Sequence, residues 1–162
     1  MKIVEGEANI EDTDSFISWL ETIGNQNNCA IQAFDATMIA GRKHIRQAVT
    51  KANRSFQRDE NVARERNIEI LLYAAGRRQI NDALELGIQE GNLSLIVVID
   101  GDNETQAKQA IAARLTDRDT IPLRDERKIR DYFDISAREL NATKGSLEDL
   151  VCERVALLDV EK

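Results

Sequence analysis

Two aspartates after the most hydrophobic run of the chain are the first residues whose spacing suggests chemistry. The stretch IDGDNET (99–105) places Asp100 and Asp102 two residues apart at the end of that run. An apolar strand ending in Asp-x-Asp resembles a phosphotransferase site, in which one aspartate attacks phosphorus and both help to hold magnesium. Glu104 stands where that pattern wants Thr or Val. The competing interpretation is a polar turn before a helix, and we expect no catalytic residue and no cofactor.

Histidine and cysteine are too few to predict a metal site or a nucleophile. His44 is the only histidine, and Cys29 and Cys152 are the only cysteines, whereas a zinc site needs three or four ligands. Both cysteines fall within apolar patterns, so we expect them in the core. His44 follows Arg42 and Lys43 at the expected start of a helix. It either contacts a phosphate or a base, or forms a local hydrogen bond.

A glycine followed by two arginines marks the bend between two predicted helices. Gly76 suits the end of a helix, but a turn does not need the guanidinium groups of Arg77 and Arg78. Arginine offers planar, bidentate donors for phosphate, and the helix after the bend would present free backbone N–H groups. Ile80 either offers an apolar surface to a base or packs inward. The pattern predicts that the 76–80 corner faces RNA.

The charge distribution allows a basic patch on an acidic body. The net charge is −7, but residues 42–78 hold ten Arg or Lys and four Asp or Glu, a balance of +6, which leaves −13 for the rest. The patch either binds nucleic acid or simply faces water. Apolar residues make up 42% of the chain, and no apolar run approaches the ~20 residues that span a bilayer. We expect one globular domain over residues 1–162, cytoplasmic and without a membrane partner.

The elements that would position these residues are predicted from hydrophobic periodicity. The 93–100 run is expected to be a central strand covered on both faces. Gly24 is expected to end the first helix, and Gly76 the third. Strands are predicted at 2–8, 29–36, 93–100 and 155–160, and helices near 13–23, 41–56, 62–75, 80–87, 103–115, 136–139 and 147–151. The fold class is therefore α/β, with a small mixed sheet of about four strands and about seven helices.

Several stretches together resemble a known family. They are DATMIAGRKHIRQAVTKA (35–52), RNIEILLYAAGRRQINDALELGI (66–88), LSLIVVI (93–99) and CERVALLDV (152–160). This combination resembles the small regulatory subunit of the KEOPS complex, the p53-related protein kinase-binding protein family. The similarity covers about residues 29–100 and 147–160, whereas 101–146 matches only loosely.

The resemblance implies a non-catalytic subunit of the complex that makes threonylcarbamoyl-adenosine on tRNA. Such a subunit binds and stimulates an atypical protein kinase that acts as an ATPase, and it recruits tRNA through the single-stranded 3′ CCA end. The residues expected to contact RNA are Arg42, Lys43, His44, Gly76, Arg77, Arg78, Gln79 and Ile80. Two alternatives stay open: a magnesium-dependent phosphotransferase using Asp100 and Asp102, and a protein adaptor without RNA contact.

Overall fold

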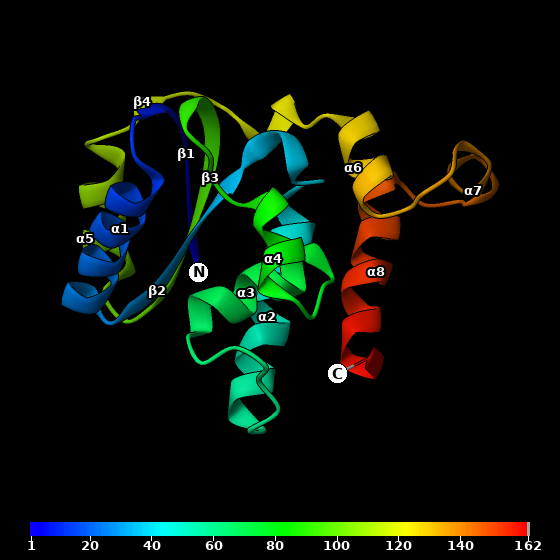
Figure 1. Cartoon of the computed structure of the whole chain (residues 1–162), viewed down its shortest axis with the longest axis horizontal. Coiled ribbons are helices and arrows are strands. Elements are labelled where there is room, and N and C mark those ends of the chain that lie inside the picture. Colours follow the sequence, from blue (N-terminus) through cyan, green and yellow to red (C-terminus); the bar gives the residue numbers. More distant parts are fainter. Residues whose placement is uncertain (162) are drawn as a thin grey trace.

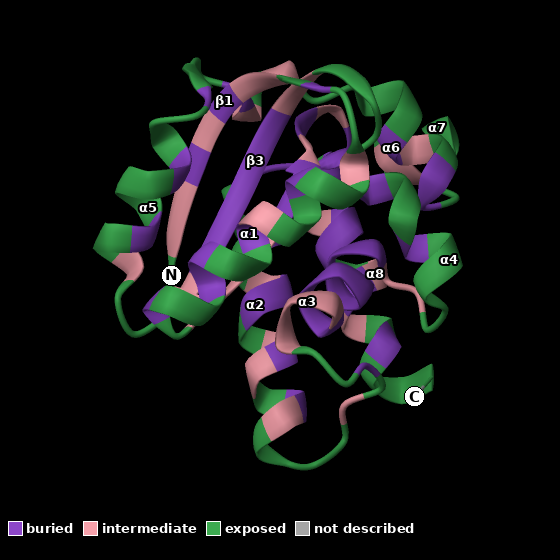
Figure 2. Cartoon of the chain, turned by 60° about the vertical axis from the view of Figure 1, so that its left-hand side comes forward, coloured by how far each residue is buried: buried purple, intermediate pink, exposed green. Residues whose placement is uncertain are grey.

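A four-stranded sheet organises the computed structural model, which describes residues 1–161 (Figure 1). Its strands are β1 (Lys2–Ile10), β2 (Cys29–Asp35), β3 (Gly91–Gly101) and β4 (Thr116–Asp117), in the order β2-β3-β1-β4. All pairings are antiparallel; Gly6, for example, lies opposite both Leu95 and Asp117. β3 is central as predicted, and its residues from Leu95 to Ile99 are fully buried (Figure 2). The α/β class and the four strands are confirmed, although the sheet is antiparallel throughout.

Helices α1 (Thr13–Asn27) and α5 (Glu104–Ala112) cover one face of the sheet (Figure 1). The Asp12 side chain caps α1 by accepting a hydrogen bond from the Asp14 N–H at 3.1 Å. The prediction that Gly24 ends this helix is wrong, because α1 continues to Asn27 and left-handed Asn28 follows it. Gly24 instead allows α1 to approach β2 closely, since a Cβ there would lie 2.7 Å from the Cys29 carbonyl oxygen.

Three longer helices pack over the other face: α2 (Arg42–Gln57), α3 (Arg66–Ala75) and α8 (Leu147–Glu161). α2 buries the predicted apolar stripe, in which Ile45, Ala48, Val49 and Ala52 are at most 4% exposed. α8 runs alongside α2 in the same direction, held by ion pairs from Lys43 to Asp149 at 2.7 Å and from Lys51 to Asp159 at 2.5 Å.

The predicted strand at 155–160 is wrong, because these residues continue α8. Val151, Val155 and Leu158 are buried at the helical spacing i, i+4, i+7. Asp159 also accepts a hydrogen bond from the Tyr73 hydroxyl at 2.6 Å, which holds the last turn against α3. The fourth strand is the short β4, in a charged segment with no clear sequence pattern.

Short helices connect the larger elements and complete the fold. They are η1 (Ala36–Met38), α4 (Ile80–Ala83), η2 (Leu84–Leu86), η3 (Ile121–Leu123), α6 (Glu126–Tyr132) and α7 (Ala137–Ala142). Ser136 caps α7 as its capping-box spacing predicts, accepting from the Glu139 N–H at 3.0 Å. None of the helices within residues 1–161 combines the length and apolarity needed to cross a bilayer.

Candidate nucleic-acid interface

The corner after α3 is built on a glycine that no other residue replaces without strain. Gly76 ends the helix with φ 62°, in the left-handed region. Its N–H donates to the Tyr73 carbonyl and the Arg77 N–H donates to the Leu72 carbonyl, both at 3.1 Å. A Cβ on Gly76 would lie 3.2 Å from the Arg154 carbonyl oxygen of α8. The end of α3 predicted from this glycine is therefore confirmed.

Arg77 is held by the protein itself. Its Nη2 donates to the Tyr132 carbonyl at 2.6 Å, and its guanidinium lies 4.5 Å from the centre of the Tyr132 ring. The Tyr132 hydroxyl in turn donates to the Asp82 carbonyl at 2.7 Å. Burial raises the pKa of Tyr132 to about 12. Arg77 thus ties the corner to α6, which leaves only part of its guanidinium group for a ligand.

The residues after Arg77 face outward. Arg78 and Gln79 are exposed, and Ile80 is 46% exposed. Ile80 is therefore not the buried contact that one interpretation expected. Leu84, which the helical pattern placed inward, is 51% exposed one turn later, so the two side chains form an exposed apolar pair. α4 has only four residues, so the predicted helix dipole and row of N–H groups behind the corner are those of a single turn.

His44 is removed from the candidate RNA-contacting residues, because its side chain is fully buried. Its Nδ1 accepts from the Ala40 N–H at 3.0 Å, and its Nε2 lies 2.7 Å from the Ala74 carbonyl oxygen. Burial lowers the pKa of His44 to about 4, although the contact to Ala74 works in the opposite direction. The local hydrogen-bonding interpretation is the right one. His44 joins the first turn of α2 to the end of α3, next to the corner.

Arg42 and Lys43 are exposed but already paired with carboxylates. Arg42 lies 3.2 Å from Glu5, and Lys43 lies 2.7 Å from Asp149. Both cations are more than half exposed, and such surface pairs contribute at most about 1 kcal/mol. A phosphate is therefore able to exchange with these carboxylates at modest cost.

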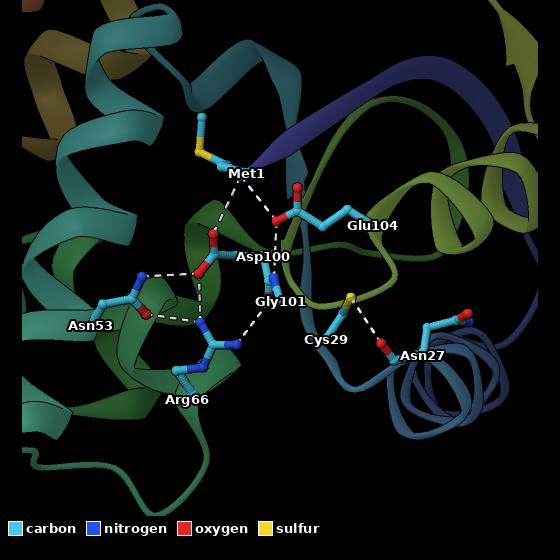
Figure 3. A network of polar contacts seen from close by, with 8 residues as sticks. All are labelled: Met1, Asn27, Cys29, Asn53, Arg66, Asp100, Gly101 and Glu104. Carbon is cyan, nitrogen blue, oxygen red and sulfur yellow. Dashed lines mark hydrogen bonds and ion pairs between the residues drawn. The ribbon is translucent and has the colours of Figure 1, made fainter.

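The two aspartates of the enzyme interpretation lie in a network of polar contacts (Figure 3). Asp100 Oδ2 accepts from Arg66 Nη1 at 2.6 Å and from Asn53 Nδ2 at 2.9 Å, and its carbonyl accepts from Arg66 Nη2 at 2.6 Å. Burial alone would raise the pKa of Asp100, but the hydrogen bonds from Asn53 and Arg66 lower it overall. Asp102 turns aside to accept from the Asn28 amide. Phosphoryl chemistry at Asp100 would require its carboxylate to leave these partners.

Sequence patterns did not reveal this network, because Asn53, Arg66 and Asp100 come from three separate elements. Arg66 also donates to Asn53 Oδ1 at 2.8 Å, which completes a closed set of contacts. In the part of the chain that the structure describes, no group of three or more His, Cys, Asp or Glu side chains is arranged to hold a metal ion.

Comparison with known proteins identifies the chain. The family described as kinase binding protein CGI-121 matches residues 8–159. The chain belongs to the kinase-binding CGI-121 family. A curated member from Methanocaldococcus jannaschii, named regulatory protein Cgi121, is 30% identical over 135 residues, which cover 81% of this chain and 84% of that protein. Membership of the CGI-121 family confirms the resemblance in the sequence, and it places the corner and the Asp100 network in a kinase-binding regulatory protein.

Proposed function

We propose that this protein is a non-catalytic subunit of the KEOPS tRNA-modifying complex, which makes threonylcarbamoyl-adenosine. It binds and stimulates the kinase-like ATPase subunit and recruits tRNA through the 3′ CCA end. The observation that carries the proposal is the match to a kinase-binding family over residues 8–159. The M. jannaschii relative, whose printed name calls it a regulatory protein, supports the same role.

The exposed part of the corner supports the RNA half of the proposal. Arg78 offers a guanidinium group to a phosphate, and Gln79 offers both a donor and an acceptor to a base edge. Ile80 and Leu84 present an apolar surface beside them, on which an unstacked base lies flat. Arg77 keeps this group in place through Tyr132. Arg42 and Lys43 remain candidates for phosphate contacts, each through exchange of a surface ion pair.

A titration of the purified protein with tRNA, with and without its CCA end, tests the RNA half. Removal of the CCA end is expected to weaken binding, and so is Arg78→Glu, because a phosphate contact and its released counterion are lost. The salt slope should flatten by about 0.7 per contact on a single strand. Arg64→Glu is the matched control, since Arg64 is exposed and precedes the opposite end of α3. Equal affinity for both tRNA forms, with Arg78→Glu indistinguishable from the control, contradicts RNA recruitment at the corner.

Size-exclusion chromatography with the cognate kinase subunit tests the protein half. A single complex at micromolar concentrations, together with faster ATP hydrolysis by the kinase, is the expected result. Two separate peaks contradict the kinase-binding half. A complex that forms without any CCA-dependent tRNA binding identifies the protein as an adaptor without RNA contact.

A further inference from the structure

Three exposed arginines lie on the outer face of α2 and form what we call the arginine stripe: Arg46, Arg54 and Arg58. At about 100° per residue the three fall within about 120° of the helix surface, and a rise of 1.5 Å per residue spreads them over about 18 Å. Over residues 1–161, no carboxylate lies within ion-pair distance of any of them. The stripe therefore presents uncompensated positive charge on a protein whose net charge is −7.

Two adjoining hollows run along this face of α2. The smaller, about 240 Å³, is lined by Lys43, Arg46, Gln47, Thr50, Lys51 and Arg54. The larger, about 540 Å³, is lined by Lys51, Arg54, Ser55, Arg58, Glu60, Tyr73 and Asp159. Arg54 and Lys51 line both hollows, so the surface is continuous. Asp159 is already bound by Lys51 and by the Tyr73 hydroxyl, which limits its repulsion of an incoming anion.

The composition of this face favours a phosphate backbone over a protein partner. Protein interfaces bury apolar and aromatic side chains at their centre. None of the exposed large hydrophobic residues among the described ones belongs to α2; they are Met1, Ile17, Val62, Ile80, Leu84, Leu157 and Val160. Guanidinium groups bind phosphate oxygens in a bidentate manner without reading sequence. A surface of arginines without an apolar centre therefore suits the backbone of a nucleic acid.

We propose that the arginine stripe binds the phosphodiester backbone of RNA, in addition to the contacts at the 76–80 corner. The inference rests on the proposed function, because its ligand is the body of the same tRNA. The two surfaces have different tasks. The corner engages the single-stranded 3′ end, whereas the stripe contributes affinity that depends on salt and not on sequence.

The test replaces the stripe by the triple variant Arg46→Gln/Arg54→Gln/Arg58→Gln. Three lost phosphate contacts flatten the slope of log K against log salt by about 2 to 3. Between 50 and 200 mM salt, the variant should therefore lose roughly 20- to 40-fold less affinity than the unmodified protein does. The matched control, Lys108→Gln/Arg127→Gln/Arg138→Gln, removes the same charge from exposed positions on α5, α6 and α7. The control should keep the original slope.

Two RNA probes separate this inference from the proposed function. In tRNA lacking its CCA end, binding at 50 mM salt should still weaken in the stripe variant and should not respond to Arg78→Glu. For a short single strand ending in CCA, Arg78→Glu should matter and the stripe should not. If corner and CCA effects are absent while the stripe effect persists, the proposed function fails and the stripe survives. The reverse pattern overturns the stripe.

Two further results keep the inference open to refutation even if the triple variant does not fold. In the unmodified protein, bound tRNA should protect the three stripe arginines from phenylglyoxal, as read by mass spectrometry; unprotected stripe arginines overturn the proposal. A folded stripe variant that binds tRNA normally but no longer binds the kinase subunit also overturns it, because the stripe would then be a protein-docking surface.

Discussion

Mild acid tests the burial of His44, the residue that joins the start of α2 to the end of α3. The imidazole is fully buried and is held between the Ala40 N–H and the Ala74 carbonyl. Protonation would place a charge in this site and would remove the Nδ1 lone pair that accepts from Ala40. The native state therefore resists protonation, whereas the unfolded chain takes up the proton at the ordinary pKa.

The size of the effect follows from the two pKa values. Burial lowers the pKa of His44 from 6.5 to about 4 in the native state. Stability is fully present above pH 6.5 and is lost as the pH falls toward 4, because only the unfolded state binds the proton in that window. At about 1.4 kcal/mol per pKa unit, the loss reaches roughly 3 kcal/mol near pH 4. Between pH 7 and pH 5 it amounts to about 2 kcal/mol.

Urea unfolding at pH 7, 6 and 5, followed by circular dichroism at constant ionic strength, measures this loss. His44 is the only histidine, and carboxylates titrate mainly below pH 5, so the window belongs to this residue. The control His44→Gln should start less stable but should show little pH dependence from 7 to 5. An equal loss in both proteins, or an imidazole that titrates near 6.5 in native-state NMR, refutes the reasoning.

Three further substitutions test the contacts around the candidate interface. Asp100→Asn leaves the partly buried guanidinium of Arg66 without its carboxylate, and it should lower the free energy of urea unfolding by about 2 kcal/mol; unchanged stability, or magnesium-dependent phosphatase activity that this change abolishes, would favour the enzyme alternative. Gly76→Ala forces a side chain into the left-handed region and should cost about 1 kcal/mol in the same assay; an unchanged midpoint would show that the corner relaxes freely. Glu69→Gln weakens a buried carboxylate that accepts from Ser55, Val62 N–H and Ala63 N–H, so it should cost about 1–3 kcal/mol and speed amide exchange at Val62 and Ala63; unaltered exchange there would contradict this role.

Local signals in the sequence predicted much of the fold. The central strand, the apolar stripe of α2 and the end of α3 at Gly76 follow from periodicity and from one left-handed glycine. The failures arose where tertiary contacts decide. Gly24 reads as a helix end but serves a close contact with Cys29 of β2. Val155 to Val160 read as a strand, but α2 and α3 hold these residues in a helix through Lys51 and Tyr73.

The candidate interface was predictable as a segment but not as a surface. The residue types at the 76–80 corner are visible in the sequence, and so is the excess of positive charge from 42 to 78. Burial of His44 depends on Ala74, 30 residues away, and anchoring of Arg77 depends on Tyr132, 55 residues away. Exposure of Ile80 and Leu84 likewise depends on how the short α4 is placed, which helical spacing does not determine.

Charge counted along the sequence differs from charge available to a ligand, and the structure shows how the difference arises. Of the ten basic residues between 42 and 78, four form ion pairs with carboxylates outside that segment, and Arg77 is held by Tyr132. The other five are exposed arginines without such a partner in residues 1–161: Arg46, Arg54, Arg58, Arg64 and Arg78. The acidic residues of α8 neutralise the two lysines on the side of α2 that packs against it, and leave the arginines of that helix facing solvent. A protein with a net charge of −7 therefore keeps a compact positive surface, while its remaining charge repels polyanions elsewhere and confines RNA to that surface.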